Sequence, residues 1–189
     1  KNLITVSNKF VKQFIENGYK GKIKTIHNGI DLDNYNHKNV NLNNAYKKFS
    51  QLKNKKIVLY AGRIITQKGV DLFIKLAKEY ENTDYYFAVA GRGDIKNFGR
   101  LVTKFNIKPG KLIYLGFLNS EDLKLVYYIS RIFILPSYYE NLPISLLEAM
   151  SMKCACVASE VGAVSEIIDN NKNGFLIKIG SYLELSNNF

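Results

Sequence analysis

Apolar residues in this chain gather in short continuous runs, separated by longer stretches in which they recur at helical spacing. A short apolar run bounded by glycine, proline or polar residues is typical of a strand buried on both faces of a parallel sheet. From residue 56 onward these runs predict strands at Ile57–Ala61, Tyr86–Ala90, Lys111–Leu115, Ile132–Leu135, Ala155–Ala158 and Phe175–Ile177. Strands that alternate with helices predict an α/β fold, a Rossmann-like parallel sheet with helices on both faces.

Helical spacing is clearest after the first of these strands. Apolar residues recur there at i, i+3, i+4 and i+7, at Val70, Phe73, Ile74 and Ala77. Two further helices are predicted at Asn119–Ile129, where Asn119 and Asp122 fit a capping box, and at Leu142–Met152.

The first 52 residues carry weaker signals. Ser7 suits the cap of a short helix that Asn17-Gly18 would close. The elements expected in this part are a strand at Leu3–Val6, a helix at Lys9–Glu16, a strand at Lys22–Ile26, and a short helix at Ala45–Phe49 within the polar stretch Asn34–Leu52.

Composition changes this picture little. A length of 189 residues suits one domain with a full core, and 47% hydrophobic residues exclude a disordered chain. No apolar run reaches the length of a membrane span. A net charge of +11 is compatible with nucleic acid, an anionic membrane surface or phosphorylated substrates, but no nucleic-acid motif accompanies it. We therefore expect no nucleic-acid partner and keep the membrane surface as a possible one.

Two features raise the question of metal or disulfide chemistry. Cys154 and Cys156 alternate along a predicted strand, where they are poorly placed to bridge each other, so buried thiols in a reducing cytoplasm are expected. Asp31 and Asp33 form an Asp-x-Asp pair of the kind that can hold a cation on a diphosphate. The pair follows a turn in a linker-like context, so we expect no metal and no cofactor.

The stretch Pro136–Glu148 carries the strongest functional signal. It follows an apolar strand and leads into a helix, so Glu140 lies in a loop at the strand's carboxyl end and Glu148 about two turns into the helix. Ligands bind at such loops in doubly wound sheets. Two glutamates eight positions apart are a weak signal by themselves, because surface helices are rich in glutamate.

The wider context of this stretch identifies a family. Together with Ala149-Met150, Val161–Glu166 and Asn173–Phe175, it resembles the retaining glycosyltransferases of the two-Rossmann-domain (GT-B) class. More narrowly, it is similar to the glycosyltransferase family 4-like group related to glycogen synthase and bacterial mannosyltransferases, whose Glu-x7-Glu signature matches Glu140 and Glu148. The resemblance covers nearly the whole chain from Asn28 onward and implies the carboxyl-terminal, donor-binding domain.

The resemblance also implies residue roles. Arg63 and Lys68, in a Gly62-Arg63…Lys68-Gly69 pattern, would contact the donor diphosphate, although their position alone fits a solvated loop equally well. Glu140 would bind sugar hydroxyls and favour cationic character at the anomeric carbon. These three are the candidate catalytic residues. The free amides at a helix start, at Asn141, Leu142 and Ile144, would assist them, and Pro143 fits the first turn of that helix.

The nucleotide would be held by residues on the remaining loops. The resemblance implies that Glu148 accepts hydrogen bonds from the ribose hydroxyls. Gly91, with Gly93, permits close approach of the backbone to a ligand, but Asp94 stands where the family usually has proline. Phe117 and Leu118 would hold the nucleobase by backbone contacts, and capping of the core is an equal alternative. His27 is interpreted as a turn residue.

The domain organisation follows from the same resemblance. An Asn-Gly-Ile-Asp turn at Asn28–Asp31 marks the end of the first GT-B domain, so residues 1–40 are interpreted as the tail of a missing amino-terminal domain and the interdomain linker. Residues 41–189 would form the nucleotide-sugar-binding domain, truncated at its carboxyl end.

The predicted function is donor binding in a retaining hexosyltransferase that moves a sugar from a nucleotide diphosphate sugar to a cell-envelope glycan or lipid acceptor. The expected location is cytoplasmic, with the inner face of the membrane as an alternative, and the chain alone is expected to be inactive. A nucleotide-sugar-binding module without transfer activity and a GT-B-type nucleotide-sugar epimerase are alternatives.

Overall fold

Six parallel strands form the central sheet, in the spatial order β5-β4-β3-β6-β7-β8. This computed structural model describes all residues from 1 to 189. The strands are β3 (Lys56–Ala61), β4 (Tyr85–Ala90), β5 (Leu112–Gly116), β6 (Ser130–Leu135), β7 (Ala155–Ser159) and β8 (Phe175–Ile177). Each corresponds to a predicted strand, with ends shifted by at most two residues. The predicted parallel sheet is therefore confirmed.

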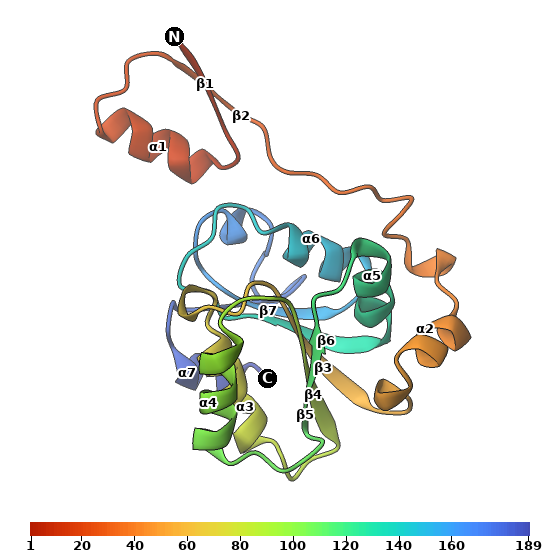
Figure 1. The fold of residues 1–189 in the computed structure, drawn as a ribbon. Coiled ribbons are helices and arrows are strands. Elements are labelled where there is room, and N and C mark those ends of the chain that lie inside the picture. Colours follow the sequence, from red (N-terminus) through yellow and green to blue (C-terminus); the bar gives the residue numbers. More distant parts are fainter.

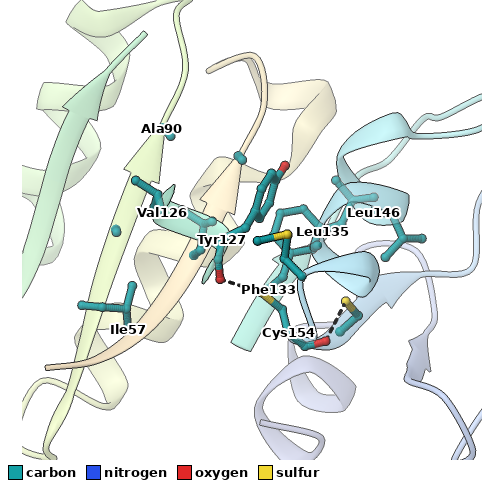
Figure 2. Packing of buried hydrophobic residues seen from close by; sticks show 14 of the residues in the cluster. Ile57, Ala90, Val126, Tyr127, Phe133, Leu135, Leu146 and Cys154 are labelled. Carbon is teal, nitrogen blue, oxygen red and sulfur yellow. Dashed lines mark hydrogen bonds between the residues drawn. The ribbon is translucent and has the colours of Figure 1, made fainter. Parts of the chain in front are cut away.

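Helices cover both faces of this sheet (Figure 1). They are α2 (Leu42–Lys48), α3 (Val70–Glu79), α4 (Ile95–Phe105), α5 (Ser120–Ile129), α6 (Ile144–Ser151) and α7 (Tyr182–Asn187). Alternate residues of β3 face opposite sides of the sheet, as a strand requires. Val58 and Tyr60 pack under α3, whereas Ile57 and Leu59 belong to the core under α2, α5 and α6. Figure 2 shows the core under α2, α5 and α6, around Phe133 and Leu146.

Two of the helices are missing from the sequence-based prediction. In α4, Phe98, Leu101, Val102 and Phe105 have the i, i+3, i+4 and i+7 spacing of a core-facing stripe, so this helix carries a sequence signal that was missed. Asp94 begins this helix because its carboxylate accepts a hydrogen bond from the Asn97 amide at 2.9 Å. Helix α7 is short and buries only Leu185, so periodicity gives little signal there.

The first elements form a separate unit, which we call the amino-terminal unit: β1 (Asn2–Thr5), α1 (Asn8–Glu16) and β2 (Lys22–Thr25). Its two parallel strands do not join the main sheet, and an extended segment connects it to α2 (Figure 1). Ser7 caps α1 as predicted, since its hydroxyl accepts from the Lys9 amide at 3.1 Å. No residue of α1 is buried, and Ile15 is 59% exposed.

Both cysteines are buried free thiols, as expected. Cys154 precedes β7 instead of lying within it, so only Cys156 is a strand residue. Burial raises the pKa of the Cys154 thiol to about 12. Such a thiol is protonated at neutral pH, which makes it a packing residue and not a nucleophile. None of the helices has the length and apolar composition needed to cross a membrane.

Candidate active site

The candidate site lies where the strands of the sheet end. The loops Gly62–Lys68 after β3, Gly91–Asp94 after β4 and Pro136–Pro143 after β6 all leave the carboxyl edge of the sheet. Because β3 lies between β4 and β6, its loop is flanked by the other two. The carboxyl edge of a doubly wound sheet is its usual ligand-binding edge.

The larger of two neighbouring cavities lies between the β3 and β6 loops and has a volume of about 680 Å³. It is lined by Asn28, Tyr60, Ala61, Gly62, Arg63, Lys68, Leu135, Tyr139, Glu140, Asn141, Leu142, Pro143, Ile144 and Ser145. All three predicted catalytic residues are among them. The structure therefore brings Arg63, Lys68 and Glu140 together in one cavity.

Lys68 and Glu140 form an ion pair within this cavity. The Lys68 Nζ lies 2.7 Å from the Glu140 Oε1, and the two side chains are only 16% and 9% exposed. The Ser137 hydroxyl, which is fully buried, donates to the same carboxylate oxygen at 2.8 Å. Burial and the Glu140 carboxylate both raise the pKa of Tyr60. The carboxylate is thus held in one orientation by two donors that come from two loops.

Helix α6 points its first turn into the same cavity. It begins at Ile144, with Pro143 at the cap position, and no side chain caps its free amides. Ile144 and Ser145 both line the cavity. Unpaired first-turn amides and the positive end of the helix dipole attract anions. The helix begins two residues later than the prediction from Leu142, because Pro143 takes the cap.

The smaller cavity, of about 290 Å³, shares Gly62 and Arg63 with the larger one. Its remaining lining residues are Ala90, Gly91, Arg92, Phe117, Leu118 and Leu123. The Arg92 guanidinium lies 5.0 Å from the centre of the Phe117 ring, which is 65% exposed. Flat apolar and cationic groups at an open cavity suit a stacked aromatic ring.

The Gly91-x-Gly93 pattern has a structural explanation. A Cβ on Gly91 would lie 1.8 Å from the Gly62 carbonyl oxygen, and one on Gly93 would lie 2.3 Å from that of Ile64. Backbone hydrogen bonds join the two loops, from the Gly62 amide to the Ala90 carbonyl and from the Ile64 amide to the Arg92 carbonyl. The two glycines therefore first allow the backbone of the β4 loop to approach the backbone of the β3 loop, whereas the prediction was an approach to a ligand. Gly91 also lines the smaller cavity.

Glu148 lies outside the lining of both cavities. Its Oε2 accepts a hydrogen bond from the buried Tyr127 hydroxyl at 3.1 Å. Burial, followed by the nearby Glu148 carboxylate, raises the pKa of Tyr127 and of Tyr35. The predicted role of Glu148 at the ribose therefore stays a prediction.

Sequence reasoning misses several residues of the site. Tyr60 falls in a predicted strand, yet its hydroxyl donates to the Arg63 carbonyl at 2.7 Å and so shapes the β3 loop. Asn28 falls in a predicted turn, but its side-chain amide donates to the Leu142 carbonyl at 3.0 Å. Arg92 and Ser137 carry no sequence signal of their own, although both stand beside predicted residues. Asp31 accepts from the amides of residues 33 and 34, which is the bonding of a turn residue.

The fold and this cavity define a glycosyltransferase domain of GT-B architecture. The family model "Glycosyl transferases group 1" matches residues 43–188, so the chain belongs to that family. An uncharacterized glycosyltransferase of Methanocaldococcus jannaschii is 30% identical over 184 residues, which cover 93% of this chain and 46% of the relative. A UDP-Gal:alpha-D-GlcNAc-diphosphoundecaprenol alpha-1,3-galactosyltransferase of Escherichia coli is 32% identical over 84% of this chain and 42% of its own.

Solved structures agree with this assignment. A glycosyltransferase from Rickettsia africae superposes with a TM-score of 0.84 at 27% identity, over 99% of this chain and 52% of that one. Anabaena HepE, crystallised with UDP, gives a TM-score of 0.86 at 23% identity, over 97% of this chain and 51% of that one. The chain thus spans about half the length of the relatives it matches. The predicted family and fold are confirmed.

Proposed function

We propose that this chain binds the donor in a retaining glycosyltransferase, which transfers a sugar from a nucleotide diphosphate sugar to a glycan or lipid acceptor. The observation that carries the proposal is the convergence of Arg63, Lys68, Glu140 and the uncapped start of α6 on one cavity. Two cationic side chains and a helix start suit a diphosphate, and one ordered carboxylate suits a sugar.

The two cavities suit two parts of one donor. The smaller cavity, with Phe117 and Arg92, would take the nucleobase, and the larger would take the diphosphate and sugar. Gly62 and Arg63 line both, so the ligand would pass the Arg63 guanidinium where base and phosphate regions meet. The Anabaena neighbour was crystallised with UDP and with UDP-glucose, which supports a uridine nucleotide as the first one to test.

Transfer breaks the bond between the anomeric carbon and a phosphate oxygen and forms a bond from that carbon to an acceptor hydroxyl. The leaving nucleoside diphosphate keeps the bonding electron pair, and the proton of the acceptor hydroxyl passes to it or to solvent. Arg63, Lys68 and the α6 amides would stabilise the charge that develops on the phosphate. Glu140 would favour positive character on the anomeric carbon while Ser137 and Lys68 hold its carboxylate in place.

The acceptor class and the domain division are parts of the same proposal. The relatives include the E. coli diphosphoundecaprenol-directed enzyme and an alpha-galactosylglucosyldiacylglycerol synthase of Streptococcus pneumoniae. These names support a glycan or lipid acceptor of the cell envelope. We assign residues 1–40 to an amino-terminal domain and its linker, because the amino-terminal unit forms a sheet of its own and exposes Ile4 and Ile15.

Calorimetric titration with UDP, GDP and their sugar conjugates tests the donor site. Wild-type chain should bind one of these nucleotides, and Lys68→Met should weaken that binding by about 10- to 100-fold, the loss of one charge-assisted hydrogen bond. Lys104→Met is the matched control, since Lys104 is exposed in the last turn of α4 and far from the loops. Failure of every nucleotide to bind, or equal affinities for wild type and Lys68→Met, would refute the assignment.

A further inference from the structure

Glu166 is the centre of a hydrogen-bond cluster that the donor site does not use. It ends the short 3-10 helix Val164–Glu166, which follows β7. Its carboxylate accepts from the Ser7 hydroxyl at 2.6 Å, from the Asn8 and Lys9 amides at 3.1 and 3.2 Å, and from the Asn8 side chain at 3.2 Å. The His27 Nε2 lies 2.8 Å from the same carboxylate. All of these partners belong to the amino-terminal unit or directly follow it.

The cluster gives α1 the negative charge that its own first turn lacks. Helix α1 has no acidic residue in its first turn, and its amides at Asn8 and Lys9 point at Glu166. A carboxylate at this end satisfies free amides and complements the helix dipole. Partial burial opposes ionisation, but hydrogen bonds from Ser7, His27 and the two amides outweigh it and lower the pKa of Glu166 to about 2.

The turn formed by residues 162–166, which includes Glu166, also contacts the loop that carries Glu140. The Ala163 amide donates to the Asn141 carbonyl at 2.7 Å, and the Glu166 amide donates to the Ala163 carbonyl at 3.0 Å. Gly162, at φ 58°, packs so closely that a Cβ there would lie 2.2 Å from the Glu140 carbonyl oxygen. One turn therefore touches the amino-terminal unit on one side and the site loop on the other.

A second link joins the same two parts. Asn28 directly follows His27, and its side-chain amide donates to the Leu142 carbonyl at 3.0 Å. His27 and Asn28 thus contact the two ends of the path that runs from Glu166 through Ala163 to the loop. Displacement of the amino-terminal unit would disturb both contacts at once.

We propose that Glu166 is a positioning residue that couples the placement of the amino-terminal unit to the order of the Glu140–Leu142 loop. It touches no substrate and acts through the loop. Only the expected effect on nucleotide affinity rests on the proposed function, whereas the expected effect on the order of the loop does not. A loop already ordered by this contact loses less conformational freedom when a nucleotide binds, so the contact raises affinity.

Hydrogen exchange and UDP calorimetry on Glu166→Gln test the coupling. Every group around the Glu166 carboxylate donates a hydrogen bond to it. Glutamine replaces one carboxylate oxygen with an amide nitrogen, which would face donors, so one acceptor would be lost. Exchange of the amides of residues 8 and 9 should rise by about 10- to 100-fold, the loss of a charge-assisted hydrogen bond. Exchange of the Ala163 amide, which donates to the Asn141 carbonyl, should rise as well, and the Kd for UDP should increase by about 3- to 10-fold.

Glu184→Gln is the matched control, because the Glu184 carboxylate accepts from the Lys178 amide at 2.7 Å but contacts neither the amino-terminal unit nor the site. It should leave exchange of the Ala163 amide and the Kd unchanged. His27→Ala removes one partner without touching the cap of α1, so it should give the same pattern more weakly if Glu166→Gln does not fold.

Two outcomes distinguish failure of the coupling from failure of the proposed function. Faster exchange at residues 8 and 9 with unchanged exchange of the Ala163 amide would make Glu166 a local cap and overturn the coupling. Absence of UDP and GDP binding by wild type would instead refute the proposed function, and exchange of the Ala163 amide alone would then decide the coupling.

Discussion

Replacement of Gly162 by alanine should disturb the site through backbone contact alone. Gly162 has φ 58°, and the new Cβ would lie 2.2 Å from the Glu140 carbonyl oxygen and 2.4 Å from that of Asn141. The left-handed backbone costs an alanine roughly 1–2 kcal/mol. Relief of the overlap requires the loop to shift by about 1 Å, and overpacking of this kind costs about 1–3 kcal/mol more. We expect a total loss of about 2–5 kcal/mol in the free energy of unfolding.

Gly110→Ala separates the two contributions. Gly110 has φ 80°, but a Cβ there would meet nothing within 4 Å, so only the backbone cost of about 1–2 kcal/mol applies. Urea denaturation of both variants measures the difference, and nucleotide titration should show weaker binding for Gly162→Ala alone. Equal stability losses in the two variants would show that the turn and the loop separate without cost, and the reasoning on their contact would then be wrong.

Three further predictions concern binding and pH. Glu148→Gln should weaken nucleotide diphosphate binding by about 1.5–3 kcal/mol, and an unchanged Kd with an intact fold would remove Glu148 from the site. Chelator should leave nucleotide affinity unchanged, whereas binding that collapses and returns with magnesium would revive a metal-binding role for Asp31 and Asp33. The pKa of Glu166 is lowered in the folded state, so its contribution to stability is present above about pH 4.5 and is lost as pH falls toward about 2. In urea titrations, the stability advantage of wild type over Glu166→Gln should therefore shrink across that pH range. A difference in stability that does not change with pH would contradict this prediction.

The parallel sheet could be predicted because burial on both faces leaves a local signature. Each strand had to be apolar along its whole length, so runs such as Ile57–Ala61 stand out without knowledge of their neighbours. The start of α1 could also be predicted from a local signal, because the Ser7 hydroxyl accepts from the Lys9 amide only two residues away. The family motif around Glu140 depended on order along the chain, and the cavity confirms that Arg63, Lys68 and Glu140 lie together.

Only the tertiary structure decided which side chains meet. The adjacency of β3 and β6 brings Lys68 within 2.7 Å of Glu140, and no local pattern determines that order of strands. Glu166 and Ser7 are 159 positions apart, yet their contact joins the amino-terminal unit to the domain. The sequence by itself therefore determined the strands of the sheet, most of the helices and the edge where the loops gather, because propensity and burial act over a few residues. Side-chain pairing depends on how the chain packs across the sheet, and only the folded structure brings those distant positions together.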